Sequence, residues 1–188
     1  MRLEDVCFSY GDKPVLQHVS LLLPPRGVTC LFGPSGCGKT TLMRLMLGLE
    51  QPLSGRIEGY FDKPAAVFQE DRLLPWKTAL ENAALPRIPR DKAAEALLSV
   101  GLSREDLTRL PRELSGGMQR RVAIARALAA ESDALFLDEP FTGIDGDNRA
   151  RIAALIRTYG VHRPVVLITH LPEEIALLQA ERIDLVKE

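Results

Sequence analysis

One glycine-rich stretch decides the fold of this chain: Gly33-Pro34-Ser35-Gly36-Cys37-Gly38-Lys39-Thr40-Thr41. Residues 28–32, just before it, form an apolar run rich in β-branched and aromatic side chains, which predicts a short buried strand. Residues 42–47, just after it, have helix-forming composition, and Gly48 is suited to end a helix. A phosphate-binding loop needs this order of strand, loop and helix. We therefore interpret the stretch as a nucleoside triphosphate site.

The residue types in the loop agree with this interpretation. Glycines let the backbone curl so that its N–H groups surround a phosphate, and the helix N-terminus favours negative charge. Lys39 can reach the β- and γ-phosphates, and the Thr40 hydroxyl can bind Mg²⁺. The alternative is a glycine-rich turn that only joins strand to helix, but a chance match to the pattern in such a chain has odds of roughly one in a hundred.

The composition narrows the class of protein. A length of 188 residues corresponds to one large domain, and a formal net charge of −1 gives no electrostatic argument for nucleic-acid binding. Cys7, Cys30 and Cys37 have no metal-binding spacing and fit a reduced, cytosolic protein better than a disulfide framework. No apolar run approaches the roughly 18 residues that span a bilayer. We therefore expect a cytosolic chain that reaches a membrane only through another subunit.

The remaining sequence predicts an α/β fold. Two strands around the turn at residues 11–14 predict an N-terminal antiparallel β region. Continuous apolar strands that alternate with helices predict a mostly parallel sheet flanked by helices. Further apolar runs predict the remaining strands, at residues 65–68, 134–137, 165–169 and 183–186.

The composition of the chain changes in residues 70–113, where alanine, leucine and charged residues dominate and prolines interrupt them. The clearest helix runs from an N-cap at Asp91 to Val100, with Gly101 just past its end. We interpret this part as an α-helical subdomain inserted into a P-loop NTPase fold. The chain is then a single domain, residues 1–188, with a nucleotide-binding core of 1–69 and about 128–188 and a helical subdomain of about 70–127.

Polar side chains follow three of the predicted strands. Asp138 and Glu139 end one strand, where Asp138 is placed to bind Mg²⁺ and Glu139 to polarise the water that attacks the γ-phosphate. A solvated acidic turn is the alternative. Gln69 and His170 follow two other strands, and ligands of parallel sheets bind outside the carboxyl ends of their strands. We expect His170 to lie within reach of a γ-phosphate; His18 and His162 have no such placement and are expected on the surface.

Ser115-Gly116-Gly117 opens a second predicted helix with a hydroxyl, bare backbone N–H groups and the positive end of a helix dipole. Ser115 could simply cap this helix, or it could bind the γ-phosphate of ATP held by a second copy. Tyr10 has two readings as well: an aromatic residue on an edge strand, or a platform that stacks on adenine.

Taken together, these motifs give a family resemblance over essentially the whole chain. The chain resembles the ATP-binding cassette proteins in the loop at residues 33–40, in Gln69, in the signature Leu114-Ser115-Gly116-Gly117-Met118-Gln119, in residues 135–139 and in His170. The resemblance implies ATP and Mg²⁺ as cofactors. It implies that Tyr10 stacks on adenine, that Gln69 senses Mg²⁺, that Glu139 is the catalytic base and that His170 is the γ-phosphate switch. It also implies that Asp145 communicates across a dimer. The family often has Ser-Ala-Leu-Asp where this chain has Thr142-Gly143-Ile144-Asp145, and the glycine is expected to loosen that loop.

A finer resemblance concerns residues 68–82, which look like the cassettes of bacterial importers for nitrate, sulfonate and taurine. It implies a homodimer, or a heterodimer of cassettes, closed around ATP and coupled to membrane-spanning permease subunits through Gln69 to Trp76. Packing of Trp76 inside the helical subdomain is the alternative. The expected function is MgATP hydrolysis that powers import, on the cytoplasmic face of the membrane and without nucleic acid. The alternatives are a non-transport cassette, for example in iron–sulfur assembly, and a regulatory module that does not hydrolyse ATP.

Overall fold

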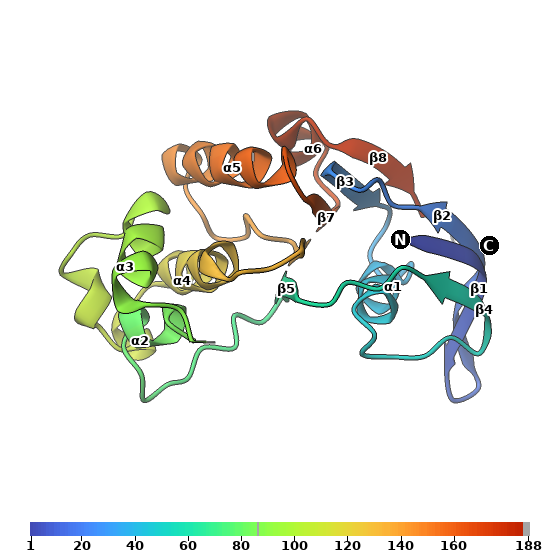
Figure 1. Cartoon of the computed structure of the whole chain (residues 1–188), viewed down its shortest axis with the longest axis horizontal. Helices are drawn as coiled ribbons and strands as arrows, with labels where there is room; N and C mark the ends of the chain where they lie inside the picture. Colours follow the sequence, from blue (N-terminus) through green and yellow to red (C-terminus); the bar gives the residue numbers. More distant parts are fainter. Residues whose placement is uncertain (86, 186–188) are drawn as a thin grey trace.

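The computed structural model describes residues 1–85 and 87–185 and contains two sheets with helices packed around them (Figure 1). The larger sheet has five parallel strands in the order β5-β6-β7-β3-β8. Its strands are β3 (Gly27–Phe32), β5 (Pro64–Val67), β6 (Ala134–Asp138), β7 (Pro164–Thr169) and β8 (Glu181–Asp184). Strands β6 and β7 are buried along their whole length, as their unbroken apolar runs predict.

The smaller sheet is antiparallel, as the sequence predicts for the N-terminal region. Its strands are β1 (Arg2–Tyr10), β2 (Lys13–Leu22) and β4 (Ser54–Glu58), in the order β2-β1-β4. The turn between β1 and β2 contains Gly11 at a φ of 56°, a conformation that glycine adopts without steric cost.

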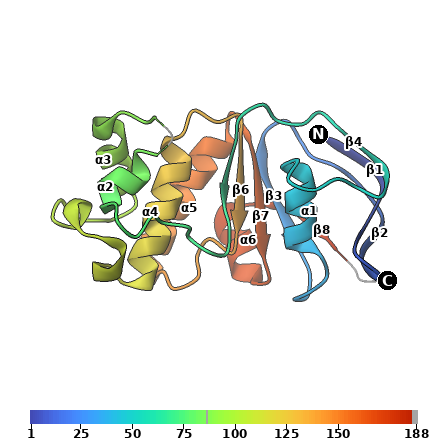
Figure 2. The same ribbon diagram turned by 90° about the horizontal axis from the view of Figure 1, so that it is seen from below.

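Helices cover both faces of the parallel sheet. Helices α4 (Gly116–Ala129) and α5 (Gly146–Gly160) lie on one side, while α1 (Lys39–Met46) lies on the other, between the parallel and the antiparallel sheet (Figure 2). Alternate residues of β6 divide between two hydrophobic clusters, Leu135 and Leu137 in one and Phe136 in the other. The sheet therefore separates two cores, one on each face.

Short helices gather around α4 at the end of the molecule farthest from the antiparallel sheet (Figure 1). They are α2 (Ala79–Ala83), α3 (Arg90–Ser99) and the 3-10 turns at Asp106–Thr108 and Pro111–Glu113. Helix α6 (Pro172–Leu178) packs beside α5. Among the described residues no helix combines the length and apolar character needed to cross a bilayer. The division of the chain into a core and a helical subdomain stays a prediction.

Two element boundaries differ from those expected. Helix α3 begins at Arg90 with Pro89 in the N-cap position, so the predicted cap at Asp91 is wrong. Proline has a fixed φ and no N–H to satisfy, so a helix can start directly after it, and Asp91 then lies in the first turn. The final strand, β8, ends at Asp184, and Val186, which was included in the expected strand, lies outside the described residues.

The last described residues, β8 and Leu185, form hydrogen bonds with β3. Strand β3 pairs with β7 on one side and with β8 on the other. The Leu185 N–H donates to the Phe32 carbonyl at 2.8 Å, and a Cβ on Gly33 would lie 2.6 Å from the Leu185 carbonyl oxygen. Glycine at position 33 is therefore required where the chain leaves β3.

Candidate functional site

The glycine-rich loop leaves the carboxyl end of β3 and turns directly into α1, which begins at Lys39. Gly36 and Gly38 have φ values of 80° and 98°, which side chains rarely allow. A Cβ on Gly38 would also lie 2.7 Å from the Leu16 side chain. The loop therefore needs glycine both for its backbone conformation and for its close approach to β2.

The Lys39 ammonium lies inside the loop that precedes it. Its Nζ donates to the carbonyl oxygens of Gly33 at 2.7 Å and Pro34 at 2.8 Å, and the side chain is buried. A buried ammonium requires such acceptors, because an unpaired one would be costly to remove from water. The lysine is thus held inside the loop, with its charge against the loop carbonyls.

Thr40, at the start of α1, contacts Asp138, the last residue of β6. The Thr40 hydroxyl donates to Asp138 Oδ2 at 2.7 Å, although the two residues are far apart in sequence. Burial raises the pKa of the Asp138 carboxyl, and the hydrogen bond from Thr40 opposes that shift. A hydroxyl and a carboxylate are the hard oxygen ligands that Mg²⁺ prefers, so this pair fits the ion expected here. In the described part of the chain, no group of three or more His, Cys, Asp or Glu side chains is arranged to hold a metal.

Glu139 and His170 lie at the ends of neighbouring strands, β6 and β7. His170 Nδ1 is 3.2 Å from Glu139 Oε1. Glu139 has a φ of 47°, which is uncommon for a residue with a side chain, and its N–H donates to the Ile168 carbonyl at 2.9 Å. This backbone conformation places a carboxylate next to the phosphate loop and an imidazole beside the carboxylate.

A cavity of about 550 Å³ joins these elements. Tyr10 stands at its rim with 46% of its surface exposed, and its ring packs edge-on against Phe8 at 4.9 Å between centroids. Gln69 and Glu139 line the cavity too. Among the described residues, its lining consists of Tyr10, Lys13, Pro14, Val15, Ser35, Gly36, Gly38, Lys39, Thr40, Thr41, Gln69, Asp138, Glu139 and Ile168. The fold thus gathers most of the predicted site residues, while the role of each stays a prediction.

The signature residues lie apart from this cavity. Gly116 and Gly117 line a second, smaller cavity of about 260 Å³, and Gln69 lines both. Ser115 caps α4, with its hydroxyl accepting from the Met118 N–H at 3.3 Å, and Asp145 caps α5, accepting from the Asn148 N–H at 3.1 Å. Hydrogen bonds from Asn148 hold the pKa of the Asp145 carboxyl below its usual value. Within one chain, therefore, Ser115 and Asp145 act as helix caps.

Gly143 has a structural role in the loop that follows β6. Its φ is 73°, and the carbonyl of Gly143 lies so close to Gly117 that a Cβ on Gly117 would be 2.2 Å from it. Glycine at 143 matches the backbone of this loop, which packs directly on the start of α4. Whether this glycine loosens the loop stays a prediction.

Sequence reasoning missed Arg120, whose buried guanidinium bonds to backbone near both Gln69 and Glu139. A signal for it was present in the sequence. Arg120 occupies the same face of its helix as Ala123, Ile124 and Ala127, which are all buried. A charged residue in such an apolar stripe requires buried partners.

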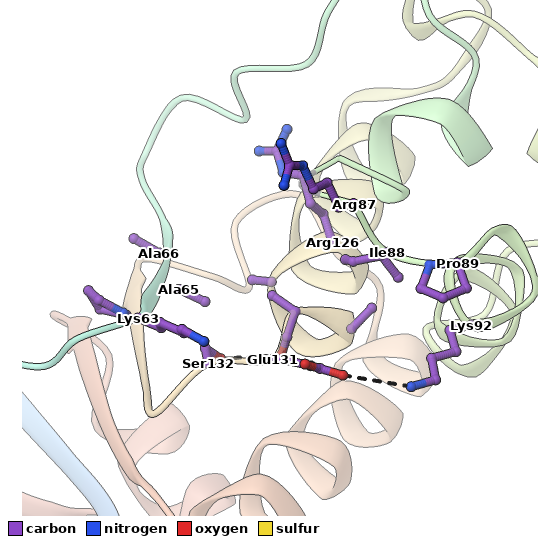
Figure 3. A pocket seen from close by; sticks show the side chains of 14 residues that line it. Lys63, Ala65, Ala66, Arg87, Ile88, Pro89, Lys92, Arg126, Glu131 and Ser132 are labelled. Carbon is purple, nitrogen blue, oxygen red and sulfur yellow. Dashed lines mark hydrogen bonds and ion pairs between the residues drawn. The ribbon is translucent and has the colours of Figure 1, made fainter.

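A larger cavity, of about 660 Å³, lies beside β5 and the carboxyl end of α4, away from the phosphate loop (Figure 3). Basic side chains line it, but two of them are already engaged. Arg126 donates to the carbonyls of Asp71 and Arg72 at 2.9 and 3.2 Å, and Lys92 lies 4.0 Å from Glu131. This cavity contains none of the predicted site residues.

Comparisons with known proteins agree with the geometry. A family model described as "ABC transporter" matches residues 16–142. The aliphatic sulfonates import ATP-binding protein SsuB 1 of Rhodococcus jostii (strain RHA1) is 41% identical over 182 residues, covering 93% of this chain and 74% of the relative. The aliphatic sulfonates import ATP-binding protein SsuB 3 of Paraburkholderia xenovorans (strain LB400) is 45% identical over 180 residues, covering 93% of this chain and 71% of that relative.

Solved structures show the same architecture. A dimer of the ATP-binding cassette MJ0796, in a post-hydrolysis state with ADP and Pi bound, superposes with a TM-score of 0.86. It is 29% identical, over 99% of this chain and 94% of that one. A second dimeric structure of MJ0796, described as a bacterial ABC transporter cassette, also has a TM-score of 0.86, at 30% identity over 98% and 93% of the two chains. The chain therefore belongs to the ABC transporter family, as an ATP-binding and ATP-hydrolysing subunit.

Proposed function

We propose that this chain hydrolyses MgATP to power an importer for aliphatic sulfonates or related small anions. The observation that carries the proposal is the cavity in which Lys39, Thr40, Gln69, Asp138 and Glu139 converge at the carboxyl ends of three parallel strands. The choice of transported compound rests on the names of the relatives, which are import proteins for aliphatic sulfonates.

The positions of these side chains support the following proposed roles within one chain. The loop N–H groups and Lys39 hold the phosphates, and Thr40 and Asp138 hold Mg²⁺, with Gln69 facing the same space. Bound Mg²⁺ would neutralise charge on the β- and γ-phosphates. Glu139 accepts a hydrogen bond from the water that attacks the γ-phosphorus, while the bond from that phosphorus to the bridging oxygen breaks. His170, 3.2 Å from Glu139, orients this carboxylate and reaches the γ-phosphate. Tyr10, at the rim, stacks on the adenine.

A second copy of the chain, or a related cassette, completes the site. Ser115, Gly116 and Gly117 do not line the cavity around the phosphate loop, and Ser115 and Gly116 are exposed at the start of α4. In a head-to-tail dimer they would reach the γ-phosphate held by the partner, with Asp145 beside the interface. The solved MJ0796 cassettes are dimeric, which supports the formation of a dimer.

The permease contact is proposed for residues 69–76. Trp76 is 71% exposed. Its side chain is therefore not packed inside the helical subdomain, which was the alternative. An exposed tryptophan next to the half-buried Leu73 and Leu74 is suited to an apolar partner surface. Through this contact the chain would lie on the cytoplasmic face of the membrane.

Glu139→Gln tests the proposal. The wild-type chain should release phosphate from MgATP, and the variant should do so at least about 100-fold more slowly, because it lacks the base. The variant should still bind ATP and elute as a dimer in size-exclusion chromatography with ATP. Glu173→Gln, an exposed position in α6, is the matched control. Unchanged phosphate release by Glu139→Gln, or a strictly monomeric elution of that variant with ATP, would contradict the proposed mechanism.

A further inference from the structure

Arg120 is a charged residue in the core of the molecule. It lies in the second turn of α4, shortly after the signature glycines, and only 3% of its surface is exposed. A guanidinium in such surroundings is stable only when acceptors surround it. The identity of these acceptors indicates what the residue holds in place.

The acceptors come from two segments that carry proposed site residues. On one side, Nη1 donates to the carbonyl of Phe68 at 2.5 Å, to that of Gln69 at 3.3 Å and to Asp71 Oδ1 at 2.9 Å. On the other side, Nη2 donates to the carbonyl of Asp138 and, at 2.8 Å, to that of Glu139. One planar group thus connects the loop after β5 to the end of β6. Lysine, with a single nitrogen, does not have this forked geometry.

The two segments held by α4 share an unusual backbone conformation. Glu139 has a φ of 47° and Arg72 a φ of 48°, in the left-handed region that costs energy for residues with side chains. The carbonyl of Glu139 accepts from Arg120, and that of Arg72 accepts from Arg126 at 3.2 Å. Strained residues persist where surrounding contacts fix them, and both contacts here are arginines of one helix.

We propose that Arg120 is a positioning residue for ATP hydrolysis. It holds the strained Glu139 backbone, and therefore the carboxylate, at the phosphate loop, and it makes that position depend on the loop at residues 68–72. A shift of this loop, which overlaps the proposed permease contact at residues 69–76, is then transmitted to Glu139 through one guanidinium. This inference rests on the proposed function, because it takes Glu139 as the hydrolytic carboxylate.

Arg120→Gln and Arg120→Lys test the inference, with Arg157→Gln as the matched control. Arg157 also donates from a partly buried guanidinium to a backbone carbonyl, that of Leu177, but it lies in α5 outside the site. We expect kcat for phosphate release to fall about 10- to 100-fold in both Arg120 variants, because small displacements of a catalytic group have effects of this order. The KM for MgATP should stay close to that of the wild type, because the phosphate loop is intact.

Amide hydrogen exchange provides a measurement that does not depend on activity. In Arg120→Gln the amides of Glu139 and Thr142, which donate to the carbonyls of Ile168 and Glu139, should exchange faster, while those of β3, β7 and α1 keep their protection. The inference is overturned if kcat falls no more than in Arg157→Gln, or if exchange rises throughout the core. If the wild-type chain releases no phosphate, the proposed function fails, and hydrogen exchange still decides whether Arg120 holds the Glu139 segment.

Discussion

Gly117→Ala probes the contact between the signature helix and the loop that follows β6. The added Cβ would lie 2.2 Å from the Gly143 carbonyl oxygen and 3.2 Å from the carbonyl carbon. Both are backbone atoms, so no side-chain rotation can relieve the overlap. Gly116→Ala is a closely matched control, because a Cβ on Gly116 would meet no atom within 4 Å.

The expected magnitude follows from two opposing contributions. Both variants replace a helical glycine by alanine, which favours folding by up to about 1 kcal/mol in a helix interior and less in a first turn. Only Gly117→Ala also overpacks its surroundings, which typically costs about 1–3 kcal/mol. The helical contribution largely cancels between neighbouring positions. Gly117→Ala should therefore be less stable than Gly116→Ala by about 1–3 kcal/mol.

Urea unfolding and thermal melting of the two variants and the wild type would measure this difference. For a chain of this size, about 1 kcal/mol corresponds to a shift in Tm of roughly 2–4 °C. Gly116→Ala should melt at or slightly above the wild-type temperature and Gly117→Ala below it. If Gly117→Ala is as stable as Gly116→Ala, the loop at residues 142–144 does not rest on α4 as described.

Three further predictions concern other parts of the molecule. Thr78→Ala removes the side chain that accepts the Glu81 N–H at 3.2 Å, and urea unfolding should show a loss of about 1 kcal/mol. Burial raises the pKa of the Glu174 carboxyl, so the folded state should lose stability as the pH rises above the ordinary value of 4.5. Glu174→Gln, which keeps an acceptor for the Thr169 hydroxyl, should flatten this decline in unfolding experiments from pH 4.5 to 8, and an unchanged pH slope would contradict the assignment. Cys37 is 4% exposed, so iodoacetamide followed by mass spectrometry should label Cys7 faster, and equal rates would show that the loop opens readily.

The sequence predicts the elements with strong local patterns. The phosphate loop is found because its residues are contiguous and lie between an apolar strand and a helix. The strands β6 and β7 are found because they are unbroken apolar runs, and polar residues directly after them predict the positions of Asp138, Glu139 and His170 at one sheet edge. Each of these features depends on neighbouring residues or on a general property of parallel sheets.

Features set by distant contacts are not predicted in the same way. The start of α3 at Arg90 was missed because Pro89 and Asp91 both suit a helix start, and only one of them can precede it. The contact of Gly143 with Gly117 was not predicted, because this contact and the φ of 73° at Gly143 depend on the packing of α4 against a remote loop. The partners of Arg120 lie in two remote segments, the loop after β5 and the end of β6, and pattern analysis normally treats arginine as a surface residue.

The position of β3 between β7 and β8 has a consequence for biosynthesis. Strand β3 leaves the ribosome early, yet both strands that pair with it, and Leu185 against Gly33, are made near the end of the described chain. Contacts between such distant segments form slowly, and until they form β3 keeps two open edges. The strand that leads into the phosphate loop therefore gains its sheet partners only after β7 and β8 have been synthesised.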